Sequence, residues 1–349
     1  MKNESVYLVE KGRFEMRESP MPAVGADDLL IEVRHVGVCG SDVQVFARPE
    51  TCMHPPVYPV ILGHECAGVV VEVGRNVRGF QPGDRVAVEP GVPCMQCPDC
   101  LEGKYNLCAQ MDFMACYPWR RAAMSRYIAH PAMMCFKLPE QVSTLEGAMM
   151  EPLSVGLQAA ERSGAKIGQH AAILGMGCIG LMTLCAVLAR GVSNTICADL
   201  FDNRLDKARE LGARHALNSA REDVVAFAME MTGGRGLDLV FETAGNPQTF
   251  ALAQKLVRPG GRIVLVGNIA QPTQVKFMEF SEREVDLISV FRYRNQFPTA
   301  IACVASGQIP VRRLATDIFP MTQAQEAFEH ALNHKQTVLK AILEFQQEA

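Results

Sequence analysis

Long runs of like charge, short-period repeats and low-complexity tracts are all absent from this sequence of 349 residues. Lysine and arginine nearly balance aspartate and glutamate, and the net charge of −4 gives no reason to expect binding to nucleic acid or to an anionic membrane. The N-terminal stretch, MKNESVYLVEKGRFEMRES, mixes charges with apolar residues and lacks the continuous apolar region of a signal peptide. We therefore expect a cytoplasmic protein of about two globular domains.

One uncharged stretch has the length of a membrane span. Residues 171–189, AAILGMGCIGLMTLCAVLA, carry no charge over 19 positions, close to the roughly 20 residues that cross a bilayer. Gly175, Gly177 and Gly180 divide this stretch into a short apolar run and a longer one. We interpret the two runs as a buried parallel strand and a helix that packs on the sheet, and we expect no membrane span.

Cysteine is abundant, and its number, thirteen, is odd. In a reducing compartment disulfides are disfavoured, so cysteines in apolar surroundings, such as Cys185, Cys197 and Cys303, are interpreted as small buried residues. Four others crowd into residues 94–108, CMQCPDCLEGKYNLC, with the spacing C-x2-C-x2-C-x7-C. Only this stretch, called the four-cysteine lobe below, requires a separate explanation.

The spacing in the four-cysteine lobe suits a closed metal site. Its thiolates can surround one tetrahedral zinc ion, the ligands being Cys94, Cys97, Cys100 and Cys108. An iron–sulfur cluster accepts the same four ligands, and a redox pair or unliganded cysteines are further alternatives. A zinc ion with four thiolate ligands has no open coordination position, so a catalytic metal has to be sought elsewhere.

A second set of candidate metal ligands is spread more widely along the chain. Three residues, Cys39, His64 and Glu151, offer the protein ligands that a catalytic zinc requires. Glu65 is either a fourth ligand or a residue that contacts a ligand without binding the metal. Taken singly, Cys39 is typical of a core residue, His64 of a hydrogen-bonded strand residue and Glu151 of a helix cap. Their spacing alone does not identify a site.

The stretch AAILGMGCIG, followed by a helical run, is typical of a dinucleotide-binding turn. Gly175 permits the tight turn, Gly177 lets the backbone approach the pyrophosphate, and Gly180 lets the helix pack on the strand. Asp199 ends the next strand, NTICAD, 19 residues after Gly180, and its carboxylate favours NAD over NADP. Arg204 either reaches the adenosine or is a solvated helix residue.

Further patterns predict a doubly wound parallel α/β sheet. Residues 236–245 and 260–268 are predicted to form strands, and residues 202–213 a helix that Gly212 closes. We place a dinucleotide-binding Rossmann domain at residues 153–293. A strand-rich catalytic domain then consists of residues 1–152 and a return segment, 294–349, with the active site in the cleft between domains.

The stretch GHECAGVVVEVGRNV (63–77) matches the signature G-H-E-x2-G-x5-G-x2-V. Together with VGVCGSD before it and the four-cysteine lobe after it, this chain resembles the zinc-containing medium-chain alcohol dehydrogenases over nearly its whole length. The resemblance implies a GroES-like β-rich catalytic domain, a catalytic zinc held by Cys39 and His64, and a structural zinc in the lobe. Glu65 ligates the catalytic zinc or exchanges with water there.

Within that family the chain looks like the sorbitol/xylitol (polyol) dehydrogenase branch. Glu151, in EPLSVG, stands where the alcohol-oxidising branch usually has cysteine, and VFRYRNQFP (290–298) is similar to a segment of the polyol branch. The resemblance makes Glu151 the third ligand, and Phe113, Arg292 and Tyr293 substrate contacts. A surface or interface role is the alternative for Arg292 and Tyr293.

The resemblance also implies the roles of the remaining site residues. Ser41 is similar to the family's proton-relay hydroxyl, and Asp42 orients a zinc ligand or sits at a helix N-terminus. Predicted cofactor contacts are Gly175, Gly177, Cys178, Ile179, Gly180, Asp199, Arg204, Val266, Val290 and Arg292. A homodimer or homotetramer is expected, and residues 284–293, EVDLISVFRY, are a candidate for the pairing edge strand.

The expected activity is hydride transfer from a secondary hydroxyl of a polyol to NAD, with zinc lowering the pKa of that hydroxyl. Alternatives are a zinc dehydrogenase for a sugar acid, a simple alcohol or threonine and, in a different class, a non-catalytic nucleotide-binding protein.

Two departures from the family pattern are informative. Gln44 stands where many relatives have a histidine, so we expect no near-neutral inflection from a titrating group there. Arg120 and Arg121 replace the usual glycine, and either they are solvated or one of them favours a substrate with a carboxylate.

Overall fold

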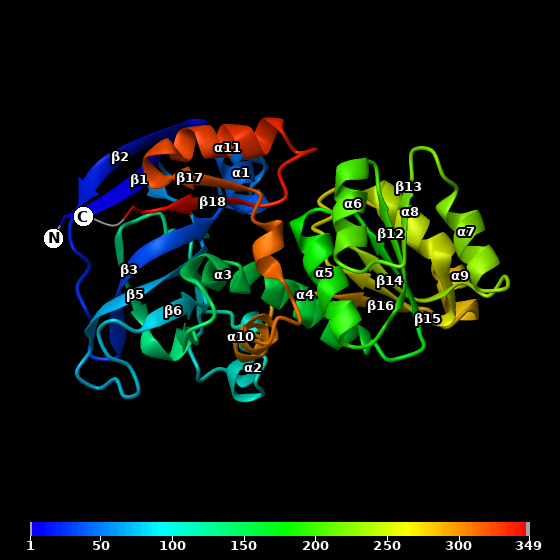
Figure 1. Ribbon diagram of the computed structural model, residues 1–349, viewed down its shortest axis with the longest axis horizontal. Helices are drawn as coiled ribbons and strands as arrows, with labels where there is room; N and C mark the ends of the chain where they lie inside the picture. Colours follow the sequence, from blue (N-terminus) through cyan, green and yellow to red (C-terminus); the bar gives the residue numbers. More distant parts are fainter. Residues whose placement is uncertain (1, 347–349) are drawn as a thin grey trace. The chain divides into compact units, whose positions relative to one another are not determined.

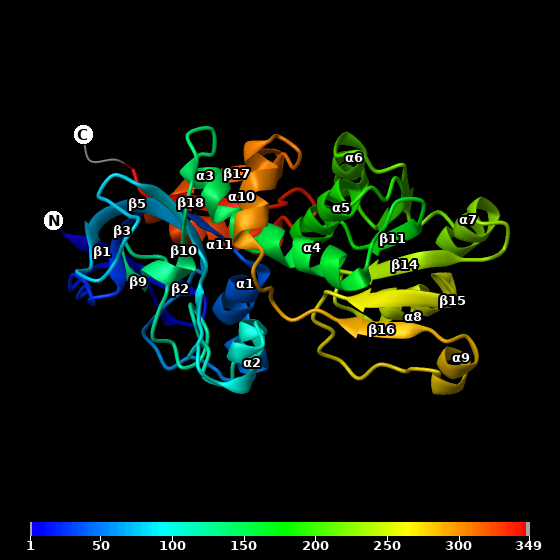
Figure 2. The same ribbon diagram turned by 90° about the horizontal axis from the view of Figure 1, so that it is seen from below.

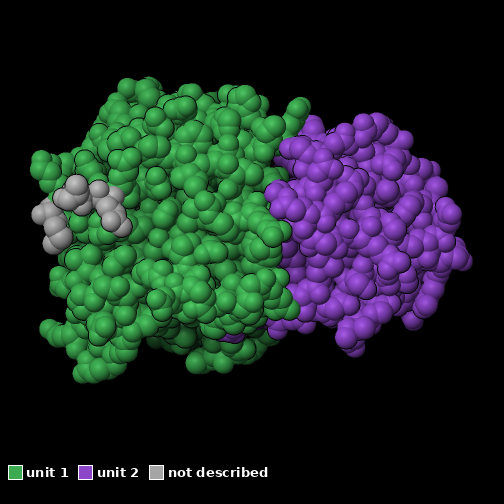
Figure 3. All heavy atoms as spheres, viewed as in Figure 1, with its two compact units in different colours: residues 1–151, 297–349 green, residues 152–296 purple. Residues whose placement is uncertain are grey.

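The computed structural model describes residues 2–346 of the chain. By its internal contacts the chain forms two compact units, which Figure 3 colours separately. Unit 1 contains Met1–Glu151 and Phe297–Ala349, and unit 2 contains Pro152–Gln296. The boundaries predicted from the sequence lie beside these limits, and the functional assignment of each unit as a domain remains a prediction.

Unit 2 is built on one six-stranded sheet in which every neighbouring pair of strands is parallel. Its strands are β11 (His170–Leu174), β12 (Asn194–Asp199), β13 (His215–Asn218), β14 (Leu237–Glu242), β15 (Val257–Leu265) and β16 (Asp286–Ser289). Its helices are α5 (Cys178–Ala189), α6 (Asp202–Glu210), α7 (Val224–Met231), α8 (Pro247–Leu256) and α9 (Phe277–Glu282), and α4 (Met150–Ser163) spans the boundary with unit 1. Strand and helix alternate along the chain, as the ribbons show (Figures 1 and 2).

The strand order is β13-β12-β11-β14-β15-β16, so the chain reverses its direction of winding between β11 and β14. Alternate residues of β11 face opposite sides, and Ala172 and Leu174 belong to a core that also contains Val224 of α7 and Phe250 of α8. Burial on both faces explains why these strands are continuously apolar. Ligands of such sheets bind beyond the carboxyl ends of the strands at the reversal point.

The uncharged segment 171–189 therefore has the predicted structure. It contains most of β11, a three-residue turn and α5, a helix of 12 residues. Among residues 2–346, no helix combines the length and the apolarity that crossing a bilayer would require. The predicted strands at 194–199, 236–245 and 260–268 are confirmed, and α6 ends near Gly212, whose φ is +100°.

Unit 1 is rich in strands. Its largest sheet has the order β10-β6-β5-β3-β18-β17, with β9 also paired to β3. The strands of this sheet are β3 (Asp28–Gly37), β5 (Glu65–Val73), β6 (Arg85–Val88), β9 (Tyr127–Pro131), β10 (Cys135–Lys137), β17 (Asp317–Pro320) and β18 (Ala341–Glu344). Smaller sheets contain β1 (Asn3–Glu10), β2 (Arg13–Ser19) and β4 (Val60–Ile61), and β7 (Gly91–Val92) with β8 (Asp112–Phe113).

The helices of unit 1 are short. They are α1 (Gly40–Ala47), α2 (Pro98–Leu101), α3 (Thr144–Ala148), α10 (Phe297–Ala305) and α11 (Ala324–Asn333), with 3-10 turns η1 (Pro49–Thr51), η2 (Tyr105–Leu107), η3 (Ala132–Met134), η4 (Val311–Leu314) and η5 (Met321–Gln323). Phe46 of α1, Phe328 of α11 and Phe14 of β2 contact one another through their rings. This cluster joins the two ends of the chain within one core.

Strand β3 lies at the centre of unit 1 and positions the residues discussed below. It pairs with β5 on one side and β18 on the other, so that Gly37 lies opposite both Glu65 and Ile342. The C-terminal segment thus returns to the strand that leads into α1. Residues separated by most of the chain length meet around the end of β3.

Two histidines, the buried His130 and the half-buried His35, make the stability of unit 1 depend on pH. Burial lowers the pKa of His130 to about 3 and that of His35 to about 4. Between about pH 4 and pH 6.5 both remain neutral in the folded protein, whereas they bind protons in the unfolded chain. The free energy of unfolding therefore falls as the pH decreases through 6.5.

We expect His130→Gln to weaken this pH dependence, because glutamine can still donate to the Glu89 carbonyl but does not titrate. Urea unfolding at pH 7.5 and pH 5 should show a loss on acidification smaller by about 2 kcal/mol than in the unmodified protein. His54→Gln, at an exposed site, is the control. Equal losses in His130→Gln and the unmodified protein would contradict the assignment.

Candidate active site

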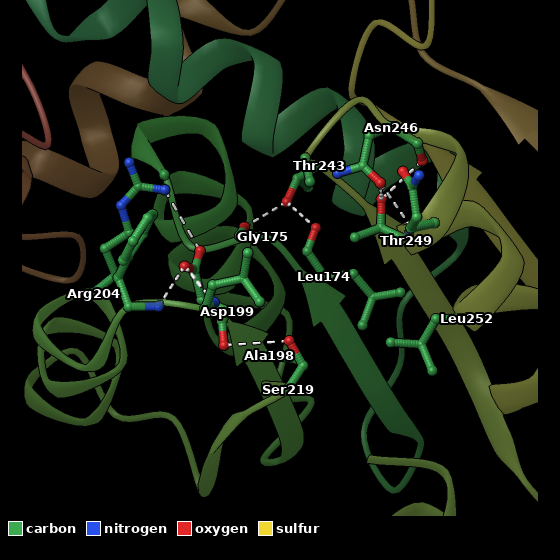
Figure 4. Close-up of a pocket in the computed structure, with 15 residues that line it drawn as sticks. Leu174, Gly175, Ala198, Asp199, Arg204, Ser219, Thr243, Asn246, Thr249 and Leu252 are labelled. Atoms are coloured by element: carbon green, nitrogen blue, oxygen red, sulfur yellow. Dashed lines mark hydrogen bonds and ion pairs between the residues drawn. The ribbon is translucent and has the colours of Figure 1, made fainter. Parts of the chain in front are cut away.

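A pocket of about 690 Å³ opens at the carboxyl ends of β11, β12 and β14 in unit 2. Gly175, Gly177, Asp199 and Arg204, four of the predicted cofactor residues, line it (Figure 4). The pocket thus lies where the winding of the sheet reverses. Its position and lining fit a dinucleotide.

The three glycines of the turn have the geometry that their roles require. Gly175 has a φ of +99° and lies against the backbone of Ala244, and a Cβ on Gly180 would overlap the Gly175 carbonyl oxygen. A Cβ on Gly177 would meet only Arg204 Nη1, at 3.9 Å, so the space beside Gly177 is open. The backbone at Gly177, where α5 begins, is accessible to an anionic ligand.

Asp199 is buried and holds the turn together through its carboxylate. Oδ2 accepts a hydrogen bond from the Met176 N–H at 2.6 Å, and Oδ1 accepts from the N–H groups of Leu200 and Phe201. Arg204 Nη1 lies 3.6 Å from Oδ2 (Figure 4). One carboxylate and one guanidinium thus share the end of β12, where an adenosine ribose would bind.

The other predicted cofactor contacts lie outside the lining of this pocket. They are Cys178, Ile179 and Gly180 at the start of α5, Val266 after β15, and Val290 and Arg292 after β16. The pocket also contains residues that the sequence analysis missed. Thr243 donates to the carbonyl groups of Leu174 and Gly175, and Ser219 donates to the Asp199 carbonyl. Thr243 directly follows β14, and Ser219 directly follows β13. Residues at the carboxyl ends of parallel strands line such pockets, so their positions could have identified them from the sequence.

A second candidate site lies in unit 1, where β3 leads into α1. The ligand atoms of Cys39, His64 and Glu65 all lie within 4.8 Å of one another. Cys39 occupies the N-cap of α1, and Glu65 is the first residue of β5. Sulfur, imidazole nitrogen and carboxylate oxygen together form a donor set that suits zinc.

The electrostatic environment of His64 favours a positive charge. Its Nδ1 lies 3.4 Å from Asp42 Oδ2, and both side chains are almost fully buried. Burial opposes protonation of His64, but the nearby Asp42 and Cys39 outweigh it and raise the pKa well above its ordinary value. A cation bound by His64 and Cys39 would be stabilised by the same groups. Asp42 is thus the charged neighbour of the ring, in the position that partners of metal-bound histidines take.

Glu65 is already engaged in this structure. Lys340 Nζ donates to Oε1 at 2.8 Å and to Oε2 at 2.7 Å, and it also donates to the Val38 carbonyl. The side chains of Lys340 and Glu65 are 4% and 1% exposed. Lys340 is a site residue that no motif pointed to.

Glu151 is buried in the first turn of α4 and is not one of the three residues that converge within 4.8 Å. Its neighbour Glu89 is buried as well, with Tyr105 donating to Oε1 at 2.8 Å. Burial raises the pKa of Glu89 to about 7, and the charge of Glu151 acts in the same direction. The role of Glu151 as a metal ligand stays a prediction.

Several predicted residues surround this group. Ser41 donates a hydrogen bond to Cys39 Sγ at 3.3 Å, and the ring of Phe113 lies 5.7 Å from that of His64. Gln44 donates to Thr51. Ser41 and Phe113 are thus beside the candidate ligands, whereas Gln44 is directed to η1.

The four-cysteine lobe forms the other group of convergent ligands. The sulfur atoms of Cys94, Cys97, Cys100 and Cys108 lie within 4.8 Å of one another. Backbone N–H groups of Gln96 and Cys97 lower the pKa of Cys94 to about 7, whereas burial and the neighbouring thiols raise that of Cys100 to about 12. All thirteen cysteines are free. Four converging thiols without a disulfide fit a structural zinc ion.

Arg120 and Arg121, which stand where relatives usually have a glycine, differ in their surroundings. Arg121 Nε donates to Asp112 at 3.0 Å, whereas Arg120 is exposed. Both line a pocket of about 540 Å³ beside β1 and β9 in unit 1. The remaining predicted substrate contacts, Arg292 and Tyr293, belong to unit 2, where Arg292 lies over the ring of Phe291.

The chain matches the family profiles "Alcohol dehydrogenase GroES-like domain" at residues 25–140 and "Zinc-binding dehydrogenase" at residues 178–306. Sorbitol dehydrogenase of Bacillus subtilis is 40% identical over 327 residues, which are 93% of this chain and 92% of that protein. The chain belongs to the zinc-type alcohol dehydrogenase family. The predicted family and fold class, a Rossmann-type parallel sheet with a GroES-like part, are confirmed.

Relatives within the family are named for different substrates. L-idonate 5-dehydrogenase of Vitis vinifera is 36% identical over 333 residues, 94% of this chain and 91% of that protein. A solved Escherichia coli oxidoreductase/dehydrogenase of unknown specificity superposes with a TM-score of 0.96 at 41% identity, covering 99% of this chain and 100% of that one. Family membership therefore makes the chain an oxidoreductase and leaves its substrate open.

Cys100→Ser should remove about one zinc per chain and destabilise unit 1, because a closed zinc site contributes directly to folding. NAD binding by unit 2 should persist. Metal analysis, thermal unfolding and NAD titration test these outcomes, with Cys303→Ser, outside both groups, as the matched control. A Cys100→Ser protein that stays fully folded but cannot transfer hydride would mean that the two metal sites were assigned the wrong way round.

Proposed function

We propose that this protein is an NAD-dependent zinc dehydrogenase that oxidises a secondary hydroxyl of a polyol to a ketose. The convergence of Cys39, His64 and Glu65 within 4.8 Å carries this proposal, because the group combines zinc-binding donors with an incomplete ligand set. The similarity to sorbitol dehydrogenase of Bacillus subtilis supports a polyol as the substrate.

Cys39 and His64 are the proposed ligands of the catalytic zinc, with Glu151 as the third. When bound, zinc would lower the pKa of a substrate hydroxyl and so assist loss of its proton. Asp42, beside His64, would orient its imidazole, and Ser41, beside Cys39, would receive the proton from the substrate. Phe113, packed against His64, would contact the carbon chain of the substrate.

NAD is the proposed acceptor of the hydride. The space beside Gly177 is open, which supports binding of the pyrophosphate there, and Asp199, which lines the pocket, would accept hydrogen bonds from the adenosine ribose. A 2′-phosphate there would meet the buried carboxylate, although Arg204 lies beside it. The carboxylate accepts a hydrogen bond from the Met176 N–H of the turn, and its negative charge favours NAD.

A sugar acid is the second candidate substrate. It is favoured by the similarity to L-idonate 5-dehydrogenase and by the exposed guanidinium of Arg120, which can pair with a carboxylate.

Self-association to a homodimer or homotetramer is part of the proposal. Strand β16 forms one edge of the sheet of unit 2, and Leu287 and Phe291 are exposed there. Unpaired edge strands with apolar side chains are common sites of pairing between subunits.

The purified protein should contain about two zinc ions per chain and reduce NAD with sorbitol, xylitol, ribitol or galactitol. Absorbance of NADH at a fixed polyol concentration measures this activity, and a parallel series of aldonates tests the second candidate. Cys39→Ala should lower turnover by about a thousandfold and remove about one zinc, whereas Cys303→Ala keeps both. Full turnover in Cys39→Ala, or none with any polyol or aldonate, would contradict the proposal.

Asp199→Asn should raise the KM for NAD by about ten- to a hundredfold, because a charged acceptor of the ribose hydroxyls is lost. The KM for NADP should fall, because the repulsion of a 2′-phosphate disappears while Arg204 remains. The control is Asp206→Asn on the exposed side of α6. An unchanged ratio of the two KM values would show that Asp199 does not select the cofactor.

A further inference from the structure

The pocket of unit 1 that both arginines line, called the β1–β9 pocket below, lies outside the two groups of candidate metal ligands. Its volume is about 540 Å³, which is in the range of small-molecule binding sites. Its lining comes from residues 3–7, residues 19–22, Ile61 and residues 112–129. All of these segments belong to unit 1, so the pocket is complete within one unit.

One face of β1 provides a polar wall of the β1–β9 pocket. Asn3, Ser5 and Tyr7 are alternate residues of this strand, so their side chains lie on the same face. Ser5 Oγ donates a hydrogen bond to Ser125 Oγ at 2.7 Å. The hydroxyls of Tyr7 and Ser19 share a second hydrogen bond, also of 2.7 Å. In each pair the accepting hydroxyl keeps its own proton, which it can donate to a ligand.

The charge of the lining is positive. Asp112, Arg120 and Arg121 are its charged residues, which leaves one positive charge in excess. Arg121 Nε donates to Asp112 Oδ2 at 3.0 Å, and Arg121 Nη1 donates to the Ala129 carbonyl at 3.3 Å. These two bonds fix the plane of one guanidinium group. Arg120 is exposed and forms no ion pair with the residues that the structure describes, 2–346, so its guanidinium is available to an anion.

The β1–β9 pocket and the candidate zinc ligands lie on opposite faces of β8. The ring of Phe113 lies 5.7 Å from that of His64, and Phe113 does not line the pocket. Its neighbours Asp112 and Met114 do line it, as the alternation of side chains along an extended segment requires. Cys39 and His64 are absent from the lining as well. A molecule in this pocket is therefore separated from the candidate zinc ligands by β8.

We propose that the β1–β9 pocket is a second binding site, for a small organic anion that carries hydroxyl groups, such as a sugar acid or a sugar phosphate. Arg120 and Arg121 bind its carboxylate or phosphate, since guanidinium groups form strong charge-assisted hydrogen bonds with both. The hydroxyl pairs that contain Ser5 and Tyr7 bind its hydroxyl groups, and Ile61 contacts its carbon chain. The proposal goes beyond the proposed function, because this ligand is not the molecule that is oxidised.

The position of the pocket also concerns the role of Arg120. A guanidinium that binds an anion across β8 from His64 does not at the same time bind a substrate at the zinc ligands. Dependence of anion binding on Arg120 is therefore expected for either site. Independence from Cys39 is the property that distinguishes the second site from the first.

Isothermal titration calorimetry of the full-length zinc-loaded protein with gluconate and, separately, with glucose 6-phosphate tests the proposal. At least one of the two should bind in an Arg120-dependent manner, and the one that binds identifies the anionic group. Glucose, which has the hydroxyl groups without the charge, should not bind. Arg120→Gln should weaken the binding about tenfold or more, because a charge-assisted hydrogen bond is lost. Arg75→Gln, at an exposed arginine outside the pocket, should leave the affinity unchanged.

Ala122→Phe tests the place of binding without a change of charge. Ala122 lines the pocket and is partly buried, so a phenyl ring there should occupy part of the volume and abolish the binding. Binding should persist in Cys39→Ala. It should also persist in the unmodified protein at a saturating concentration of the polyol that this protein oxidises.

Loss of anion binding in Cys39→Ala, or its displacement by the polyol, would place the anion at the zinc ligands and overturn the proposal. Absence of binding by both probes up to about 10 mM, or equal affinity in Arg120→Gln and the unmodified protein, would also overturn it. None of these results affects the proposed function, because NADH formation from a polyol is measured without the anion.

Discussion

Buried negative charge beside Cys39 and His64 is the constraint on which the arrangement of unit 1 depends. Asp42 and Glu65 are both about 1% exposed, and both lie within a few ångströms of the candidate ligands. Isolated buried carboxylates are very costly, so each needs a cationic partner. Lys340 supplies that partner for Glu65, and His64 supplies it for Asp42.

The topology of unit 1 follows from the need to bring these partners together. Strand β3 runs between β5 and β18, so the end of one strand is adjacent to Glu65 on one side and to the segment from Lys340 to Ala341 on the other. The C-terminal segment of the chain thereby completes a site that begins at Cys39. A glycine at position 37 leaves the space that the ion pair occupies.

The two groups of candidate metal ligands differ in how their members are spaced along the chain, as structural and catalytic zinc sites commonly do. The four-cysteine lobe takes all its ligands from fifteen consecutive residues and leaves no open position. The Cys39 group takes its members from separate elements, and a carboxylate within its reach is held by a lysine. A dense run of ligands in the sequence therefore suits the proposed structural site, whereas the fold assembles the proposed reactive site.

The parts that could be predicted from sequence are those in which neighbours along the chain are also neighbours in space. The turn containing Gly175, Gly177 and Gly180, and Asp199 at the end of the next strand, follow from local strand–turn–helix geometry. Lys340 could not be predicted, because it lies 275 residues from Glu65 and a lone lysine has no distinctive pattern. For Glu151 the expectation came from family resemblance, and its role as a ligand stays a prediction.

The central claim is that zinc binds at Cys39 and His64 as well as in the four-cysteine lobe. Anomalous diffraction at the zinc absorption edge, from crystals of the zinc-loaded protein, tests it most directly. We expect two peaks per chain, one among the four cysteines of the lobe and one beside Cys39 and His64. A single peak in the lobe, with none beside Cys39 and His64, would contradict this account.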